Sequence, residues 1–377
     1  MAITDSAGKS RRAQRWVIKL GSAILAGADS GLNTPLIQAL ADKALELRAR
    51  GIEIVLVSSG AIAHGMARLR WTRRPHELHQ LQAAAAVGQM GLIRAYQRAF
   101  ERHNVETAQV LLTSADLNDR RRYLNARSAL RSMLELGIVP VINENDTVAT
   151  EEIQFGDNDS LGALVGNLIE ADYLVILTDQ EGLYEADPRS HPDAVLVREG
   201  KAGDPALAAF AGGSGALGRG GMQTKLQAAA KAARSGASTI ICSGRHLENL
   251  TKIAEGNYPG TLLRATSGRI AARKQWLAGR MQTSGRLLID DGAAGVLRGG
   301  GKSLLPVGVV RVEGRFQRGD LVDCVSVVTG ETIARGLVNY SAEDALKIAG
   351  KASGAIEELL GFIDEPELIH RDNMVVL

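Results

Sequence analysis

Cysteine is scarce in this sequence of 377 residues, which contains only Cys242 and Cys324. The two lie far apart in the chain, and neither belongs to a CxxC pair. A disulfide framework and a zinc ribbon are therefore excluded, because both need paired or closely spaced cysteines. This usage is typical of a reducing compartment, and we expect the protein in the cytoplasm.

Long apolar segments are also missing. No run approaches the roughly 20 apolar residues that a helix needs to span a bilayer, so we expect no membrane segment and no membrane partner. The first residues are polar and lack the apolar middle of a signal peptide. We expect residues 1–14 to form a disordered tail.

Neither sign of charge dominates the composition. Lys and Arg number 44 and Asp and Glu number 42, which gives a net charge of +2 at pH 7. A large surface for nucleic acid would need a clear basic excess. The balance therefore argues against nucleic acid as the main partner.

Short apolar runs alternate with longer helical patterns over most of the chain. This alternation predicts an α/β fold in which a mainly parallel, open sheet is sandwiched by helices. The predicted strands are 16–20, 52–57, 108–112, 138–142, 173–177 and 238–242. The predicted helices are 34–50, 77–102, 123–136, 160–169 and 224–235.

The pattern changes towards the C-terminus, where short strands are separated by glycine-containing turns. Four strands are predicted there, at 287–289, 307–312, 321–328 and 333–338. We therefore expect a large α/β domain at 15–266, a linker at 267–283 and a small β-rich domain at 284–377.

Polar side chains follow four of the predicted parallel strands, at the point where each strand ends. They are Lys19 to Ser22, Ser58 to Ala61, Asn143 to Asp146, and Thr178 with Asp179. Ligands of open α/β sheets bind at the carboxyl ends of the strands. Four such clusters at one edge indicate a binding site, whereas a single cluster would be an ordinary loop.

Two further segments contribute polar and charged groups that are expected to lie at this edge. Asp157, Asn158 and Asp159 precede a helix, where one of them could serve as an N-cap but the run exceeds what capping needs. The segment from Gly218 to Lys225 places glycines and then Thr-Lys at a helix start, a pattern that favours an anion.

Together these groups indicate phosphoryl transfer, which depends on positioning and on neutralising charge. Lys19 and Lys225 supply cations, and the acidic residues suit Mg²⁺. No general base is evident. A carboxylate acceptor needs none, because it is already ionised at neutral pH. The motifs therefore favour a kinase that forms an acyl phosphate.

These segments resemble the amino-acid kinase family over about Trp16 to Leu263. The residues that carry the resemblance are Lys19-Leu20-Gly21-Ser22, Val57-Ser58-Ser59-Gly60-Ala61, Ile142-Asn143-Glu144-Asn145-Asp146, Gly156-Asp157-Asn158-Asp159, Leu177-Thr178-Asp179 and Gly220-Gly221-Met222-x-Thr224-Lys225. Residues 284–371 resemble a PUA domain. Ser22 and Arg219 depart from the usual family residues, which bears on nucleotide contacts.

The resemblance implies ATP-dependent phosphorylation of the γ-carboxylate of L-glutamate, with ATP and Mg²⁺ as cofactors. Lys19 and Lys225 would neutralise the phosphoryl group in transit, and Asp159 would organise those lysines or the metal. The implied glutamate-binding residues are Ser59, Asp146 and Asn158, with Asn143 and Asp157 nearby. The implied nucleotide-binding residues are Lys19, Thr178, Asp179, Arg219, Gly220, Gly221, Met222, Gln223, Thr224 and Lys225. No residue is assigned as a metal ligand.

The resemblance also implies a place in proline biosynthesis, as its first step, with feedback inhibition by proline. It implies a homo-oligomer, either a dimer or a tetramer. The product would pass to a γ-glutamyl phosphate reductase.

Two alternatives stay open at this point. In the first, the protein is another kinase of the same family, whose acceptor is acetylglutamate, aspartate, carbamate or UMP instead of glutamate. The PUA-like domain could instead bind RNA, although Arg280–Leu377 contains 11 basic and 14 acidic residues and few aromatic side chains for stacking on bases.

Overall fold

The computed structural model describes residues 3–4, 10–11, 13–27, 31–150, 158–211, 221–266 and 283–377. Most of the expected tail and linker lies outside these residues. The chain divides into two compact units, each described by itself here. Unit 1 comprises Met1–Leu117 and Arg127–Arg269, and unit 2 comprises Asn118–Ala126 and Ile270–Leu377.

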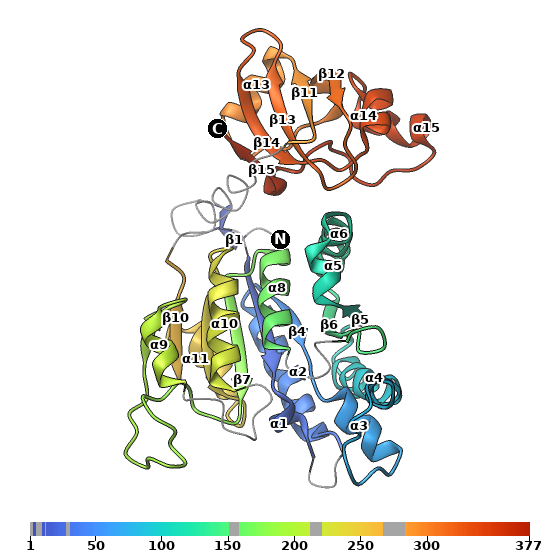
Figure 1. Ribbon diagram of the computed structural model, residues 1–377. Coiled ribbons are helices and arrows are strands. Elements are labelled where there is room, and N and C mark those ends of the chain that lie inside the picture. Colours follow the sequence, from blue (N-terminus) through green and yellow to red (C-terminus); the bar gives the residue numbers. More distant parts are fainter. Residues whose placement is uncertain are drawn as a thin grey trace. The chain divides into compact units, whose positions relative to one another are not determined.

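Unit 1 is built on an eight-stranded sheet with the strand order β5-β6-β4-β3-β7-β9-β10-β8 (Figure 1). Its strands are β3 (Gln14–Leu20), β4 (Ile52–Val57), β5 (Thr107–Leu112), β6 (Val139–Glu144), β7 (Tyr173–Thr178), β8 (Glu199–Lys201), β9 (Ser238–Ser243) and β10 (Thr261–Arg264). Neighbours from β5 to β9 pair in parallel, and β10 runs antiparallel to β9 and parallel to β8. A short antiparallel pair, β1 (Ile3–Thr4) and β2 (Ser10–Arg11), precedes the sheet.

Helices connect these strands and cover both faces of the sheet. They are α1 (Ser22–Leu25), α2 (Thr34–Ala49), α3 (Ala61–Arg68), α4 (Leu78–Glu101), α8 (Asp159–Ile169), α9 (Pro205–Phe210), α10 (Met222–Ala233) and α11 (Glu248–Ala254). Two further helices between β5 and β6, α5 (Ser114–Asn118) and α6 (Arg120–Glu135), belong partly to unit 2, because that unit includes Asn118–Ala126. The α2 helix begins as its sequence predicts, because the Asn33 side chain accepts a hydrogen bond from the Leu36 amide and Pro35 occupies the first turn.

Alternation along β3 decides which side chains meet which helices. Trp16, Ile18 and Leu20 enter the core that also contains residues of α2, α4 and α11. The intervening side chains, Val17 and Lys19, face α8 on the other side of the sheet. On that side α8 and α10 lie against one another (Figure 1).

Unit 2 contains a five-stranded sheet with the order β12-β11-β13-β14-β15. Its strands are β11 (Gly285–Ile289), β12 (Val309–Gly314), β13 (Leu321–Ser326), β14 (Thr332–Leu337) and β15 (Met374–Val376), and its helices include α13 (Asp291–Arg298), α14 (Ala342–Ile348) and α15 (Ile356–Leu360). A separate apolar core fills it, with Phe316, Cys324 and Tyr340 among its buried members.

The predicted fold class is confirmed: a mainly parallel α/β sheet is accompanied by a separate β-rich unit at the C-terminus. Several short elements escaped the sequence analysis, among them α3, α11 and the antiparallel strand β10. Such elements are too short for a clear periodic pattern, and packing against the sheet decides them. Among the helices that the structure describes, none is long and apolar enough to cross a membrane.

The helices α3 and α4 approach each other unusually closely through two glycines. A Cβ atom on Gly88 would lie 1.8 Å from the Ala61 carbonyl oxygen, and one on Gly65 would lie 1.7 Å from the Ala84 carbonyl oxygen. These neighbours are backbone atoms, which cannot rotate away. The contact matters for the site because α3 begins directly after the Ser58-Ser59-Gly60 turn.

We expect Gly88→Ala to lower the free energy of unfolding by about 3 kcal/mol, because the added methyl group forces the two helix backbones apart. Urea unfolding followed by circular dichroism would measure the loss. Gly295→Ala is the matched control in α13, where an added Cβ meets nothing within 4 Å. The control should be neutral or stabilising. Equal midpoints for Gly88→Ala and wild type would contradict the expectation.

Candidate active site

Lys19 occupies the penultimate position of the central strand β3 and is 3% exposed. Its side chain faces α8, where Gly162 makes room for it: a Cβ atom on Gly162 would lie 3.5 Å from the Cβ atom of Lys19. A lysine buried on a central strand needs a charged partner, because an unpaired buried ammonium group is costly.

Asp159 supplies that partner and joins three elements at one point. This first residue of α8 is fully buried. Its Oδ1 atom lies 2.5 Å from Lys19 Nζ, and its Oδ2 atom lies 2.9 Å from Lys225 Nζ on α10. Lys225 is 5% exposed. Two ammonium groups from β3 and α10 therefore share one carboxylate from α8.

The electrostatics of this trio favour an anionic ligand. Burial alone would raise the pKa of Asp159, but the charges of Lys19 and Lys225 outweigh burial and hold that pKa below its ordinary value. Asp159 is thus ionised at neutral pH. With both lysines charged, the trio carries one more positive than negative charge, which suits phosphate.

The N-terminus of α10 lies beside the trio. Gly221 is the N-cap, and the Thr224 hydroxyl lies 2.8 Å from the Gly221 carbonyl oxygen and 3.1 Å from Asp159 Oδ2. Met222 is half-buried and Gln223 is exposed in the first turn. The first amide groups of a helix lack partners within the helix and, with its dipole, favour an anion.

A buried chain of amide groups lies next to the trio, because Asn158 directly precedes Asp159. Asn158 Nδ2 donates to the Ser58 carbonyl oxygen at 2.5 Å and to Asn143 Oδ1 at 2.6 Å. Asn143 Nδ2 in turn donates to Gln89 Oε1 at 2.7 Å. These bonds connect the ends of β4 and β6 to the start of α8.

Tyr96 ends this chain of contacts on its other side. The tyrosine is fully buried on α4, and its hydroxyl lies 3.0 Å from the Ser58 hydroxyl. Burial raises the pKa of Tyr96 well above its ordinary value, although the bond to Ser58 acts in the opposite direction, so the phenol stays protonated. Ser59, the next residue, is 5% exposed.

Asp146 lies in the loop after β6 and is half-buried. Burial raises its pKa to about 6, and the charge of Arg74 opposes that rise. Among the described residues, no hydrogen bond joins the Asp146 carboxylate to the Asn158 amide group. The two groups are related only by their place at the same edge of the sheet.

Thr178 and Asp179 follow β7 at this edge. The Thr178 hydroxyl donates to Asp179 Oδ1 at 3.1 Å, and the Asp179 side chain is exposed. The structure brings neither residue into direct contact with Lys19 or Lys225 among the described hydrogen bonds and ion pairs. It places them next to β3, because the Gly21 amide donates to the Leu177 carbonyl oxygen at 3.0 Å.

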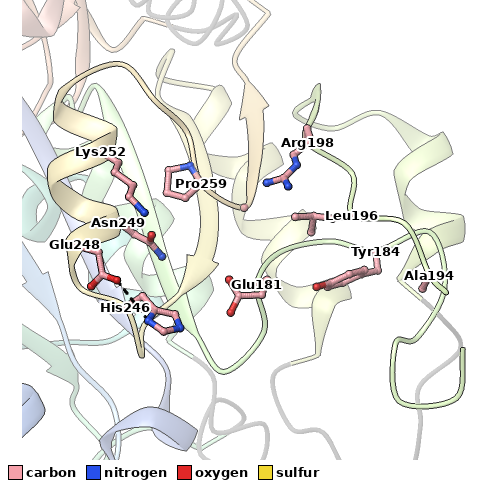
Figure 2. A pocket seen from close by; sticks show the side chains of 11 residues that line it. Glu181, Tyr184, Ala194, Leu196, Arg198, His246, Glu248, Asn249, Lys252 and Pro259 are labelled. Carbon is pink, nitrogen blue, oxygen red and sulfur yellow. Dashed lines mark ion pairs between the residues drawn. The ribbon is translucent and has the colours of Figure 1, made fainter. Parts of the chain in front are cut away.

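A cavity of about 590 Å³ is lined by residues that follow Asp179 in the chain, together with residues of α11 and of the segments before β8 and β10 (Figure 2). Glu181 and Tyr184 line it from the loop after β7, Arg198 from the segment before β8, and Lys252 from α11. Both signs of charge and a phenol ring face the same space. Its volume is in the range of pockets that hold small organic ligands.

The structure thus unites the expected catalytic residues Lys19, Asp159 and Lys225 in direct contact. It also unites Asn143 with Asn158. Asp157, Arg219 and Gly220 lie outside the described residues. Within the described ranges, no group of three or more His, Cys, Asp or Glu side chains could hold a metal ion by itself.

Two site residues escaped the sequence analysis, namely Gln89 and Tyr96. Both lie in the middle of the long helix α4, where polar side chains are common and usually face solvent. Their spacing of seven residues places them on one face of the helix. This shared face is the one feature of the sequence that could have indicated that both side chains reach the site.

Two family profiles match the chain, and several known proteins are similar to it over its full length. The profile of the amino acid kinase family matches residues 14–243, and the profile of the PUA domain matches residues 285–360. The glutamate 5-kinase of Chromohalobacter salexigens is 59% identical over 379 residues, which cover 100% of both chains. That of Thioalkalivibrio sulfidiphilus is 58% identical over 376 residues, again with 100% of both chains covered.

A third relative and one solved structure complete the comparison. The glutamate 5-kinase of Stutzerimonas stutzeri is 59% identical over 366 residues, or 97% of this chain and 98% of the relative. A UMP kinase structure from Bacillus anthracis superposes with a TM-score of 0.51 at 17% identity, over 68% of this chain and 98% of that one. This structural likeness concerns the fold alone.

Proposed function

This chain belongs to the amino acid kinase family, and from that premise we propose that it transfers the γ-phosphoryl group of ATP to the γ-carboxylate of L-glutamate. The full-length similarity to glutamate 5-kinases supports the substrate pair. The observation that carries the chemistry is the buried Lys19–Asp159–Lys225 trio.

In the proposed reaction the protein forms no covalent bond to the substrates. An oxygen of the glutamate γ-carboxylate forms a bond to the γ-phosphorus of ATP while the bond from that phosphorus to the bridging oxygen breaks. ADP leaves with the electron pair, and γ-glutamyl phosphate is formed. No general base is required, because the γ-carboxylate is ionised at neutral pH.

Lys19 and Lys225 act on the charge that moves during this transfer. Their ammonium groups enter the site from β3 and α10 and are held by one carboxylate, so they need no reorganisation when the phosphoryl group passes. Preorganised cations in a buried site stabilise a transition state far better than mobile ones in water. Asp159 is a positioning residue in this scheme.

We propose that Mg²⁺ enters with the phosphates of ATP. The described residues offer no cage of three ligating side chains, whereas Mg²⁺ is commonly held by phosphates, waters and one or two carboxylates. Bound in this way, the ion would screen the phosphate charges. The first amides of α10, with Gly221, Met222, Gln223 and Thr224, would hold the phosphate chain from the other side.

We assign the cavity of Figure 2 to the nucleoside end of ATP. Its lining starts at Glu181, two residues after Asp179, and β7, which ends at Thr178, pairs with β3. Tyr184 offers a ring for the base, and Glu181 offers a carboxylate for ribose hydroxyls.

Glutamate would lie at the amide chain and at Asp146. Asp146 would bind the α-ammonium group as a carboxylate, with Ser59, Asn143 and Asn158 lining the same site. Asp157 precedes Asn158 and completes the proposed set.

The raised pKa of Asp146 predicts a pH dependence. As the pH falls below about 6, the carboxyl group takes up a proton and loses its attraction for the ammonium group. We expect kcat/KM for glutamate to fall towards tenfold per pH unit below that pH, since kcat/KM reports the free enzyme. Initial rates between pH 5 and 8 would test this, with kcat/KM for ATP as the internal control. A glutamate profile that stays flat through pH 6 would remove Asp146 from this role.

An ADP-release assay with ATP and Mg²⁺ tests the function as a whole. L-glutamate, N-acetylglutamate, aspartate, carbamate and UMP would be compared, with hydroxylamine present to trap an acyl phosphate. Hydroxamate formed with glutamate alone is the expected outcome. Turnover with another acceptor would keep the fold and the lysine roles and overturn the substrate.

We further propose that the enzyme performs the first step of proline biosynthesis and that proline inhibits it. The family resemblance supports both statements, together with assembly into a dimer or tetramer and delivery of the product to a γ-glutamyl phosphate reductase. Titration of proline into the same assay, and light scattering of the purified protein, would test inhibition and assembly.

A further inference from the structure

The helix α4 reaches the proposed glutamate site through a single face. Gln89 and Tyr96 are seven residues apart, or about 10 Å along the helix axis. Gln89 accepts a hydrogen bond from Asn143, and Tyr96 is hydrogen-bonded to Ser58. One rigid element therefore holds both ends of the buried amide chain.

The hydrogen bonds determine how each amide group is turned. An amide nitrogen has two protons, and its oxygen can only accept. Both protons of Asn158 Nδ2 are used, one by the Ser58 carbonyl oxygen and one by Asn143 Oδ1. The side-chain oxygen of Asn158, Oδ1, has no hydrogen-bond partner within the described part of the chain, and it caps no amide of α8.

Gln89 and the Ser58 carbonyl oxygen fix the orientation of the chain of amide groups from its two ends. The side-chain oxygen of Gln89 accepts from Asn143 Nδ2, which turns Asn143 Oδ1 towards Asn158. That oxygen in turn requires the amide nitrogen of Asn158. If Asn143 were turned over, its NH₂ group would face the NH₂ group of Asn158, and two donors would meet in a buried place. Such an unsatisfied contact costs about 1–3 kcal/mol.

We propose that Gln89 is a positioning residue that makes the site selective for an acceptor bearing an ammonium group. Through Asn143, and together with the Ser58 carbonyl oxygen, it keeps Asn158 turned so that Asn158 offers its side-chain oxygen to the substrate. A carbonyl oxygen accepts from the α-ammonium group of an amino acid and repels a carboxylate. This inference rests on the proposed function, because it assumes glutamate as the acceptor.

The test compares glutamate with glutarate, the same dicarboxylate without the ammonium group. Gln89→Met keeps the length of the side chain and removes the acceptor. We expect its KM for glutamate to rise about tenfold, which corresponds to the loss of one charge-assisted hydrogen bond. Its KM for ATP and its KM for glutarate should stay within about twofold of wild type.

Two further variants make the result specific. Gln89→Glu restores an oxygen acceptor for Asn143 and should return the glutamate KM to within about threefold of wild type. Gln97→Met makes the same change on the exposed face of α4, where Gln97 contacts Glu101, and should alter neither KM. If Gln89→Met does not fold, Gln89→Lys replaces it, because lysine keeps a long polar chain but offers donors alone.

The outcomes separate the two proposals. Failure of the wild-type protein to phosphorylate glutamate would overturn the proposed function before any variant is compared. With an active wild type, equal changes for glutamate and glutarate in Gln89→Met, or no change for either, would overturn the role of Gln89. A fall in the glutamate-to-glutarate preference that Gln89→Glu restores is the supporting result.

Discussion

Replacing Lys225 by methionine should lower kcat by about 10³-fold while the protein stays folded. The variant keeps most of the aliphatic stem and removes the ammonium group that lies 2.9 Å from Asp159. Asp159 then keeps Lys19 as its partner, so the folded state contains one buried ion pair with balanced charge. The loss of one preorganised charge contact typically raises the activation free energy by about 4 kcal/mol. That increase corresponds to a decrease in kcat of about 10³-fold.

A lysine on the same helix provides the matched control. Lys231 is half-buried on α10, and its Nζ donates to Ser160 Oγ at 3.0 Å, away from the trio. Lys231→Met should keep kcat within about threefold of wild type. Steady-state kinetics and thermal unfolding would be measured for both variants. A kcat for Lys225→Met within tenfold of wild type, at an unchanged melting temperature, would show that this ammonium group does not act on the transferred phosphoryl group.

Replacing Asp159 by asparagine should damage both stability and activity. The change leaves two buried ammonium groups against a neutral amide, and removal of one partner from a buried ion pair costs about 3–5 kcal/mol. We expect the free energy of unfolding to fall by that amount at pH 7. We expect kcat to fall by at least 10²-fold, because Lys19 and Lys225 are no longer held together.

The pH dependence of this stability loss has a definite sign. Because the folded state lowers the pKa of Asp159, its contribution is complete above the unfolded pKa near 4 and is lost as the pH falls through the folded value. The gap between wild type and Asp159→Asn should thus be constant from pH 5 to 7 and should narrow below about pH 4. Urea unfolding at several pH values would measure it.

Asp187→Asn is the control for stability. Asp187 also pairs with a cation, Arg189, at 3.0 Å, but the pair is exposed. Exposed ion pairs contribute about 0–1 kcal/mol, so this variant should unfold close to wild type. Equal unfolding free energies for Asp159→Asn and Asp187→Asn would refute the structural role of the buried trio.

The parallel core of the fold could be predicted from the sequence because its strands are buried on both faces. Such strands are nearly continuous apolar runs, and β4 and β7 match their predicted ranges to within one residue. The short antiparallel strand β10 and the short helix α3 could not be predicted. Their sequences carry no period that distinguishes them from loops, and they form because the neighbouring sheet and the glycine contact with α4 stabilise them.

The candidate site, like the fold, could be predicted from the sequence only in part. The sequence alone determined that polar groups, among them Lys19 and Asn143, follow buried strands, and parallel strands must bring such groups to one edge. It also determined that Lys225 opens a helix after glycines. That both lysines converge on Asp159 depends on the packing of α8 and α10 against the same face of the sheet.

Only the tertiary structure decided the roles of Gln89 and Tyr96. Local sequence sets the period and the ends of a helix, and α4 would form with many other side chains at these positions. Which of its polar groups face the site depends on how α4 packs against α2, α3 and the sheet. Hydrogen bonds between residues 54 positions apart, as between Asn143 and Gln89, leave no pattern in a single sequence, because the chain brings them together only after the helix and the sheet have packed.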